Sequence, residues 1–398
     1  MKRLCIAVVA LTLLPVAAGA ATEQVLWSFG DKKPDGRYPT GGLISVNGTL
    51  YGTTDYGGEG SHHRECQQKT TCGIVFSLDP ETGMEKVQWL FGNGADGSNP
   101  EAGLISLEGM LYGTTTHGGQ SHYGTAFSLN PGTGAETVVY SFCSQQNCTD
   151  GSSPPANLIS VKETLYGTTP DGGQYGYGTV FSLDPTTGTE KVLWSFGNGA
   201  DGQYPEAGLI SVKGMLYGTT ELGGQYSDGA VFSLDPTTGK EKVLWSFGNG
   251  TDGRYPEADL ISVGGTLYGT TYAGGQYNCP DTSCGTVFSF DPRTIAEKVL
   301  WSFGNGIDGW NPAAGLVFVD GTLYGTTYYG GDNCLSAGCG IVFSLDPTTD
   351  TETVLWSFGS GTDGKSPGGG LISVNGTLYG TTEFGGAHGR GTVFSLTP

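Results

Sequence analysis

The chain is poor in positive charge and in long apolar segments. Of its 398 residues, 18 are Lys or Arg and 38 are Asp or Glu, which gives a formal net charge of −20. A protein this acidic repels phosphate backbones and anionic lipid headgroups, which argues against nucleic acid and anionic membranes as partners. The one long apolar run covers residues 4–16 and is too short for a membrane span. No segment keeps a helical hydrophobic period, which argues against a helical fold.

The first 20 residues have the pattern of a secretory signal peptide. Lys2 and Arg3 precede the apolar run, and the small residues Ala18, Gly19 and Ala20 follow it. We expect cleavage near Ala20, with residues 1–20 as the signal peptide and residues 21–398 as one domain. The mature protein is then secreted or periplasmic, with no membrane span, and we expect a monomer.

Cysteine is scarce, yet its spacing is regular. Apart from Cys5 in the signal peptide, eight cysteines remain, and they form four close pairs. In an exported chain this predicts four local disulfides. Zinc binding is the alternative, but the pairs lie in different repeats and lack histidines at zinc-finger spacing. The predicted pairs are Cys66/Cys72, Cys143/Cys148, Cys279/Cys284 and Cys334/Cys339.

A repeated pentapeptide, LYGTT, dominates the rest of the chain. Its seven copies lie within longer repeats of about 51 to 61 residues. A motif repeated in this way builds the fold, so function is to be sought where the copies differ. The copies begin at Leu50, Leu111, Leu165, Leu216, Leu267, Leu323 and Leu378.

Each repeat predicts four short strands, A to D. In residues 208–247 the runs GLISV, LYGTT, VFSLD and EKVLWSF are separated by turn signals. The A–B connection is a two-residue hairpin turn and the C–D connection is a tight DPTTG-type turn. We expect a Trp or Tyr of strand D in the blade-to-blade core of each repeat. These residues are Trp27, Trp89, Tyr140, Trp194, Trp245, Trp301 and Trp356.

The two ends of the chain complement one another. Residues 23–29 form a lone D strand, and the last repeat supplies only strands A, B and C. Joining them completes seven units and removes the open edges that a solenoid would leave. The sequence therefore predicts an all-β, seven-bladed β-propeller with four antiparallel strands per blade. The N-terminal strand completes the last blade and closes the ring.

These motifs also carry a family resemblance. The repeat resembles the tandem repeats of GloVer-containing proteins, a bacterial extracellular family. The motifs that carry this resemblance are LYGTT with a following Gly-Gly pair, then GTVFSLDP, then VLWSFG. The resemblance covers nearly all of the mature chain. It implies an extracellular repeat protein and brings no activity with it.

The B–C and D–A loops share one face of such a propeller, and the tight turns share the other. All five histidines lie in B–C loops of blades 7, 1 and 2. With nearby arginines and a tyrosine they could provide acid–base catalysis on an anionic glycan, although solvated loop residues are the simpler interpretation. The catalytic candidates are His62, His63, His117, His122, His388, Arg64, Arg390 and Tyr123.

Aromatic and acidic side chains on the same face are candidates for ligand binding. Exposed rings stack on sugars or anchor a protein partner, and packing between loops is the alternative. The ligand-binding candidates are Tyr56, Tyr272, Trp310, Tyr328, Tyr329, Phe384, Asp55 and Glu383.

Repeated carboxylates form two sets of candidate cation ligands. One set belongs to the DG-x-x-P motif, where an Asx-type turn is the structural alternative. The other set lies near the mouth of the expected axial channel, where ordinary rim charge is the alternative. No cofactor is predicted, and calcium or another divalent cation is the ligand that these carboxylates would suit. The candidates are Asp96, Asp201, Asp252, Glu101, Glu206 and Glu257.

The absence of a catalytic signature, beside an aromatic-rich face, favours a non-catalytic binding propeller for a carbohydrate or a surface protein. A secreted polysaccharide lyase or hydrolase, with its site on blades 7, 1 and 2, is the first alternative. A purely structural cell-surface repeat protein is the second.

Overall fold

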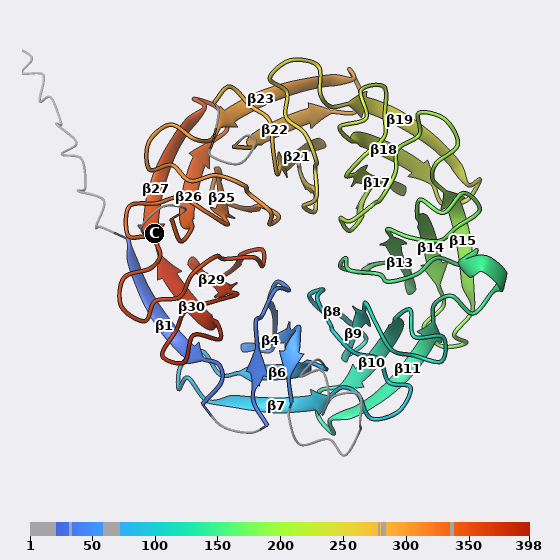
Figure 1. The fold of residues 1–398 in the computed structure, drawn as a ribbon, viewed down its shortest axis with the longest axis horizontal. Helices are drawn as coiled ribbons and strands as arrows, with labels where there is room; N and C mark the ends of the chain where they lie inside the picture. Colours follow the sequence, from blue (N-terminus) through green and yellow to red (C-terminus); the bar gives the residue numbers. More distant parts are fainter. Residues whose placement is uncertain (1–20, 32–33, 59–71, 278, 280–283, 335–337) are drawn as a thin grey trace, which may run out of the picture.

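The chain forms a ring of seven four-stranded antiparallel sheets around a central axis (Figure 1). The computed structural model describes residues 21–31, 34–58, 72–277, 279, 284–334 and 338–398. Within these residues the only helical element is the short 3-10 helix η1 (Gln146–Cys148), so no helix there could cross a membrane. The predicted all-β, seven-bladed propeller is confirmed.

Each blade runs from strand A at the axis to strand D at the rim. Blade 1 contains β3 (Ile44–Val46), β4 (Thr49–Thr54), β6 (Ile74–Leu78) and β7 (Glu85–Leu90), and blade 2 contains β8 (Ile105–Leu107), β9 (Met110–Thr115), β10 (Thr125–Asn130) and β11 (Ala135–Ser141). Blade 3 contains β12 (Ile159–Val161), β13 (Thr164–Thr169), β14 (Thr179–Leu183) and β15 (Glu190–Ser195), and blade 4 contains β16 (Ile210–Val212), β17 (Met215–Thr220), β18 (Ala230–Asp235) and β19 (Lys240–Ser246). Blade 5 contains β20 (Ile261–Val263), β21 (Thr266–Thr271), β22 (Thr286–Asp291) and β23 (Ala296–Ser302), and blade 6 contains β24 (Val317–Val319), β25 (Thr322–Thr327), β26 (Ile341–Asp346) and β27 (Thr351–Ser357). Blade 7 contains β28 (Ile372–Val374), β29 (Thr377–Thr382), β30 (Thr392–Thr397) and β1 (Thr22–Ser28).

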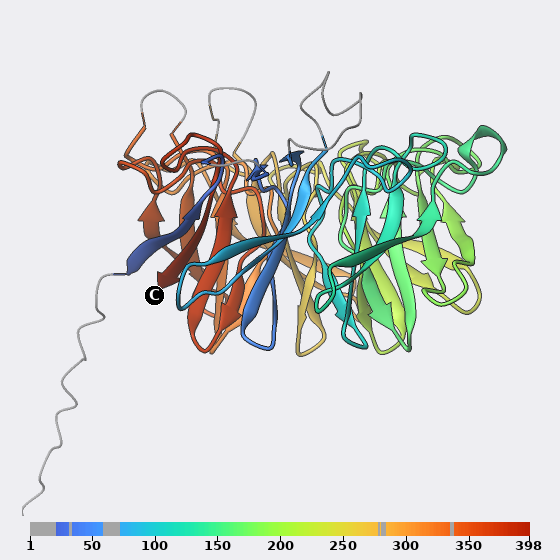
Figure 2. The same cartoon turned by 90° about the horizontal axis from the view of Figure 1, so that it is seen from below.

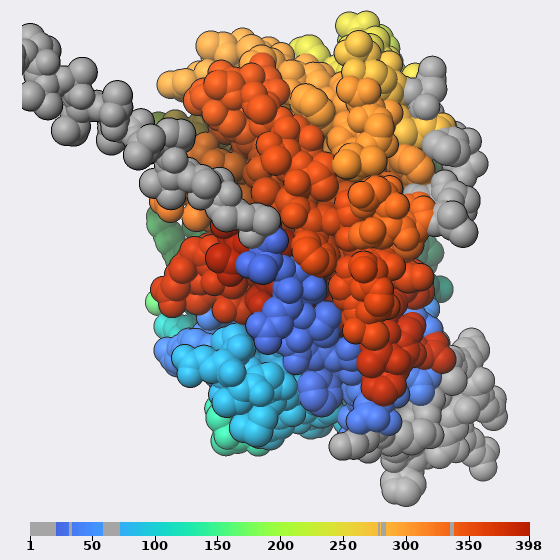
Figure 3. Space-filling view, turned by 90° about the vertical axis from the view of Figure 1, so that its left-hand side faces the viewer, coloured from blue at the N-terminus to red at the C-terminus, as the bar shows by residue number. Residues whose placement is uncertain are grey.

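The N-terminal strand completes the last blade, as the sequence predicts. β1 pairs antiparallel with β30, from Thr22 opposite Thr397 to Ser28 opposite Thr392. Figure 3 shows N-terminal residues, in blue, lying against C-terminal residues, in red, on the surface of the ring. The pairing gives the outer edge of β30 a partner, so the ring closes through main-chain hydrogen bonds.

The two faces of the ring differ as expected. In the side view the hairpin turns lie on one face and the long loops on the other (Figure 2). The A–B turn of blade 1 has positive φ at Asn47 (52°) and Gly48 (83°), which is the geometry of a type I′ turn. We call the opposite face, formed by the B–C and D–A loops, the long-loop face.

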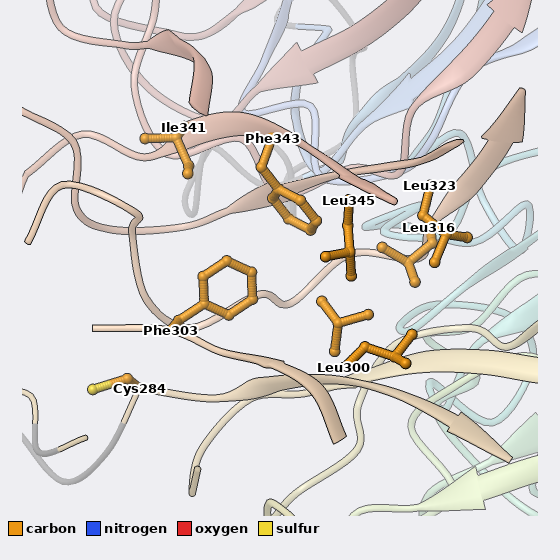
Figure 4. Close-up of a cluster of buried hydrophobic side chains, with 9 residues drawn as sticks. Cys284, Leu300, Phe303, Leu316, Leu323, Ile341, Phe343 and Leu345 are labelled. Atoms are coloured by element: carbon orange, nitrogen blue, oxygen red, sulfur yellow. The ribbon is translucent and has the colours of Figure 1, made fainter. Parts of the chain in front are cut away.

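Phenylalanine, rather than tryptophan, forms the centre of every blade-to-blade contact. Each pair joins the Phe after strand D to a Phe on strand C of the next blade, edge to face, with ring centroids 5.0 or 5.1 Å apart. Figure 4 shows one such pair, Phe303 and Phe343, among buried aliphatic side chains. The seven pairs are Phe29/Phe76, Phe91/Phe127, Phe142/Phe181, Phe196/Phe232, Phe247/Phe288, Phe303/Phe343 and Phe358/Phe394.

The prediction that strand-D Trp residues fill this core needs correction. Trp89 and its counterparts are only partly buried and pack against the edge of the core. The indole of Trp89 donates to Asp96 Oδ2 at 3.2 Å, which keeps one end of the ring in a polar setting. A fully apolar Phe two residues further on is better suited to the interior, because it has no N–H to satisfy.

A glutamate near the start of strand D also faces each blade junction. In all seven blades its Oε1 atom is buried and has no hydrogen-bond partner in the described residues. Burial, reinforced by the Asp of the preceding blade's DG motif, raises the pKa of these carboxyls to about 7 or 8. We call them the junction glutamates: Glu23, Glu85, Glu136, Glu190, Glu241, Glu297 and Glu352.

Four of the five positions of the LYGTT motif have a clear structural role. In blade 1, Leu50 is buried in the core, and Thr53 Oγ1 donates to the carbonyl of Ala102 in blade 2 at 2.7 Å. In blade 2 the last threonine, Thr115, bonds to Thr125 on strand C at 2.9 Å. The glycine lies beneath the strand-C Phe and leaves no room for a side chain.

We expect Gly218→Ala to lower the free energy of unfolding by about 1–3 kcal/mol through overpacking. An added Cβ would lie 2.7 Å from Phe232 Cζ and 2.9 Å from Leu209 Cδ2, both in the close-packed core. Chemical denaturation measures the effect. Gly132→Ala, at a glycine in an exposed turn, is the matched control, and an equal loss in both variants would contradict the packing argument.

Three of the four predicted disulfides are present: Cys143–Cys148, Cys279–Cys284 and Cys334–Cys339. In the fourth pair Cys72 is disulfide-bonded, and Cys66 lies outside the described residues. The predicted signal peptide, residues 1–20, also lies outside them. Disulfides are typical of extracellular and periplasmic proteins, which agrees with the predicted export.

Candidate functional site

Neighbouring loops on the long-loop face are joined by short antiparallel pairings. Each links the D–A loop entering a blade to the B–C loop of that blade, and all seven blades have one. We call these pairings the loop bridges. They are β2 (Gly36–Arg37) with β5 (Tyr56–Gly57), Ser98↔His117, Ser152↔Asp171, Gln203↔Leu222, Arg254↔Ala273, Trp310↔Tyr329 and Lys365↔Phe384. The loops that bear the candidate residues are therefore held in place by main-chain hydrogen bonds.

Six aromatic side chains form an arc over blades 6, 7 and 1, in two groups of ring contacts. Trp310 contacts Tyr329 with centroids 6.2 Å apart, and Tyr329 contacts Tyr328 at 4.8 Å. Tyr328 donates to Glu383 Oε2 at 2.6 Å, and Phe384 follows Glu383 in the chain. We call Trp310, Tyr329, Tyr328, Phe384, Tyr38 and Tyr56 the aromatic arc.

Tyr38 joins the Phe384 and Tyr56 rings of this arc and was not among the ligand-binding candidates. Its ring contacts Phe384 at 5.3 Å and Tyr56 at 5.6 Å. The guanidinium of Arg390 lies 5.4 Å from the centre of the Tyr38 ring and hydrogen-bonds to its hydroxyl. The signal was present in the sequence, because Tyr38 precedes the Pro of the DG-x-x-P motif in blade 1 and therefore lies where that loop turns toward the axis.

The structure brings most of the predicted ligand-binding residues together. Trp310, Tyr328, Tyr329, Phe384 and Tyr56 belong to the arc, with Glu383 inside it. Asp55 precedes Tyr56 and accepts a hydrogen bond from Asn99 Nδ2 at 2.8 Å. The remaining candidate, Tyr272, lies one blade away and interacts electrostatically with both Tyr329 and Glu257.

An acidic cavity lies beside the arc, at the axis of the ring. It has a volume of about 130 Å³ and is lined by the segments that lead into strand A. The predicted axial carboxylates Glu101, Glu206 and Glu257 line it, together with Asp259. No Lys, Arg or His is among its lining residues in the described part of the chain.

Burial and mutual repulsion perturb these carboxyls. Desolvation, followed by repulsion from Asp55, raises the pKa of Glu101 to about 7. Desolvation and then Glu221, Asp171 and Glu101 raise the pKa of Glu206 to about 7. Desolvation and then Glu221 and Glu206 raise the pKa of Glu257 to about 8. The cavity therefore carries unneutralised negative potential, which favours either protons or a cationic ligand.

Three of the eight predicted catalytic residues lie in a loop outside the described residues, and the others are spread over the long-loop face. His62, His63 and Arg64 lie outside the described residues. His122 and Tyr123 are exposed on the B–C loop of blade 2, and His388 is exposed and 3.9 Å from Asp31. In the described residues no group of three or more His, Cys, Asp or Glu side chains could hold a metal ion.

His117 is the one described histidine within a polar network near the axis. Thr116 Oγ1 lies 2.9 Å from His117 Nδ1 and 3.1 Å from Glu101 Oε1. His117 is also an electrostatic neighbour of Asp55. This network places an acid with a raised pKa, a hydroxyl and an imidazole beside the cavity.

The Asp residues of the DG-x-x-P motif accept hydrogen bonds within their own loops. Asp96 Oδ1 accepts from the backbone N–H groups of Gly92 (3.1 Å) and Asn93 (2.9 Å). Asp201 and Asp252 each accept from a glycine N–H at 3.1 Å. This is the geometry of an Asx-type turn that ties each D–A loop to its own blade.

Comparison with known proteins finds one matching repeat family and several structures with a similar fold. A model of the Gloeobacter/Verrucomicrobia repeat matches residues 12–144, 63–282 and 280–398. Comparison with curated proteins gives no match.

Several solved structures share the propeller fold. The extracellular domain of a hybrid two-component system from B. thetaiotaomicron has a TM-score of 0.57 at 10% identity, covering 91% of this chain and 38% of that one. Oligogalacturonate lyase from Vibrio parahaemolyticus has a TM-score of 0.53 at 9% identity, covering 95% and 97%. Quinohemoprotein alcohol dehydrogenase from Comamonas testosteroni has a TM-score of 0.53 at 14% identity, covering 95% and 76%. At these identities the likeness shows the fold alone.

Proposed function

The chain belongs to the Gloeobacter/Verrucomicrobia repeat family, and we propose that it is an exported binding propeller that recognises a carbohydrate through the aromatic arc. The observation that carries this proposal is the row of aromatic side chains from Trp310 to Tyr56 on the long-loop face, in which two groups of ring contacts are joined by the Tyr328–Glu383 hydrogen bond. Aromatic faces and edges bury the apolar side of a sugar ring, and their hydroxyl groups remain available for hydrogen bonds.

The loop bridges hold the aromatic arc in place, which favours binding without large rearrangement. Four of its members take part directly in loop bridges: Trp310, Tyr329, Phe384 and, through β5, Tyr56. Because these loops are already ordered, binding costs less conformational entropy than it would on unpaired loops.

A protein partner fits the described surface less well. The large apolar side chains that are exposed elsewhere, such as Met84, Ile295 and Ile307, lie in separate turns and loops. Scattered residues of this kind form no continuous apolar patch, whereas protein interfaces have a buried apolar centre.

A polysaccharide lyase or hydrolase is the second candidate function. It is supported by the Glu101–Thr116–His117 network, because a carboxyl whose pKa is about 7 can exchange protons near neutral pH. A propeller of this kind would bind the chain on the arc and cleave it beside the axial cavity.

We expect Trp310→Ala and Phe384→Ala each to weaken oligosaccharide binding by about tenfold or more, since each removes a stacking surface worth about 1.4 kcal/mol or more. Binding is measured by calorimetry with neutral, acidic and amino-sugar oligosaccharides, and product formation on the same panel reports any cleavage.

Tyr226→Ala is the matched control for this experiment. Tyr226 lies on the long-loop face of blade 4 and is 41% exposed, close to the 38% of Phe384. An equal loss of binding in Tyr226→Ala, or no loss in the two arc variants, would overturn the placement of the site. Turnover that disappears in His117→Ala would favour the second candidate.

A further inference from the structure

The axial cavity departs from sevenfold symmetry at one position. In each blade a buried Leu precedes strand A, and in five blades the residue just before that Leu is glycine: Gly42, Gly103, Gly208, Gly315 and Gly370. It is Asn157 in blade 3 and Asp259 in blade 5, on either side of Gly208 in blade 4. Asn157 and Asp259 both line the cavity. The two side chains therefore enter a space that the other blades leave open.

Hydrogen bonds fix the orientation of both side chains. Asn157 Nδ2 donates to Asp259 Oδ2 at 2.6 Å, and the backbone N–H of Gly208 donates to Asp259 Oδ1 at 2.6 Å. An ionised Asp259 only accepts hydrogen bonds, so the NH₂ group of Asn157 is the side of the amide that faces it. Its Oδ1 atom is left shielded from solvent without a hydrogen-bond donor in the described residues.

An unsatisfied, buried amide oxygen is costly, so a donor should be supplied by a ligand or water. A Cβ built on Gly103 would lie 2.9 Å from this Oδ1 atom, so the oxygen faces the adjacent blade 2. Glu101 belongs to the same segment of blade 2 and lines the same cavity. A donor that reaches Asn157 Oδ1 therefore enters a space bordered by carboxylates.

The arrangement suits an organic cation better than a directly coordinated metal. In the described residues no three carboxylates lie close enough together to hold a metal ion. The volume of about 130 Å³ is that of roughly four water molecules, at about 30 Å³ each. An ammonium group has three N–H donors that point in different directions, which suits acceptors spread around a small cavity.

We propose that the axial cavity binds the ammonium group of an amino sugar, with Asn157 Oδ1 and the carboxylates of Asp259, Glu206 and Glu257 as its acceptors. The inference rests on the proposed carbohydrate function and specifies its ligand class. Tyr272 is an electrostatic neighbour of both Glu257 and Tyr329, so it lies between the cavity and the aromatic arc.

The ionisation of the cavity supports this choice of ligand. Carboxyls with pKa values of about 7 and 8 are partly protonated at neutral pH while the cavity is empty. A bound ammonium favours their ionised forms, so the cavity releases protons on binding. The amine of the sugar must itself stay protonated, so we expect the tightest binding near neutral pH and weaker binding on either side. The groups that oppose ionisation are the neighbouring acids Asp55, Asp171 and Glu221.

The test is calorimetric titration with a glucosamine tetramer, an N-acetylglucosamine tetramer and a galacturonate tetramer. We expect the glucosamine tetramer to bind at least about tenfold more tightly than its acetylated counterpart, which has no charge on nitrogen. The double variant N157G/D259G restores the glycine of the other blades and should fold, as thermal melting would verify. It should weaken glucosamine binding by about tenfold or more.

Two further probes separate failure of the inference from failure of the proposed function. If no oligosaccharide binds but 1,4-diaminobutane binds and depends on Asn157 and Asp259, the carbohydrate function fails and the cationic cavity stands. Equal binding of the charged and acetylated tetramers overturns the inference while the carbohydrate function survives. Binding of Ca²⁺ alone that the double variant abolishes also overturns it, in favour of a metal site.

Discussion

Deletion of residues 21–29 is expected to abolish the stable ring and to produce a chain that aggregates. The deletion removes β1, so the outer edge of β30 loses the partner strand that runs from Thr22 to Ser28. It also removes Phe29, whose ring packs on Phe76 at 5.1 Å and closes the last blade-to-blade contact. An open edge strand beside an uncovered apolar surface is a site for association between chains. Size-exclusion chromatography and thermal melting would measure the result.

Two point variants calibrate this effect. Phe29→Ala keeps the strand but removes the ring contact, and we expect a loss of about 3–5 kcal/mol in the free energy of unfolding. Phe196→Ala makes the same change in the Phe196/Phe232 pair between blades 3 and 4, and should cost a similar amount. Adding a synthetic peptide of residues 21–31 to the truncated chain should restore the melting transition. A truncated chain that melts like the full chain would show that β1 does not hold the ring closed.

Stability is expected to fall as pH rises from about 5 to about 8.5. The junction glutamates have pKa values of about 7 or 8 in the folded chain and about 4.5 when unfolded. Between these values the folded state binds more protons than the unfolded state, so each unit of pH lowers the free energy of unfolding. The contribution is fully present below about pH 4.5 and is lost as pH passes 8. The melting temperature should therefore be several degrees higher at pH 5.5 than at pH 8.5.

One junction is enough to test the origin of this dependence. Glu241 faces the DG-motif residue Asp201 of the preceding blade, and its Oε1 atom has no hydrogen-bond partner. Glu241→Gln should melt close to the wild type at pH 5.5 and above it at pH 8.5, because a neutral amide replaces a carboxyl that must ionise. Glu81→Gln, in the exposed C–D turn of blade 1, is the control and should leave the pH profile unchanged. A profile that is also unchanged in Glu241→Gln would assign the dependence to other groups.

Repetition made the architecture predictable from the sequence. The seven LYGTT copies, the two-residue A–B turns and the lone strand predicted at residues 23–29 are local patterns, which depend little on contacts between distant repeats. The number of blades, the strand order and the closure by β1 followed from them. The three described disulfides also followed from spacing, because each joins cysteines only five positions apart.

The site was less predictable because it depends on contacts between distant repeats. Tyr38 and Arg390 are 352 positions apart in the sequence and hydrogen-bond only because the ring closes. Asn157 and Asp259 each look like an ordinary substitution in one repeat, and their pairing across Gly208 appears only when the seven segments meet at the axis. The Trp residues of strand D pack against the blade-to-blade clusters but are only partly buried, so their size and repetition suggested more burial than they have.

The loop bridges also bear on how such a face can change over generations. Each bridge anchors one end of a B–C loop, and the glycine before strand C anchors the other. The segment between LYGTT and that glycine has 8 residues in blade 3 (170–177) and 18 in blade 1 (55–72). Lengthening a loop between fixed anchors costs little, since closure entropy grows only with the logarithm of length. Natural variation can therefore rewrite one loop at a time and create new specificities, while the other six blades keep the ring intact.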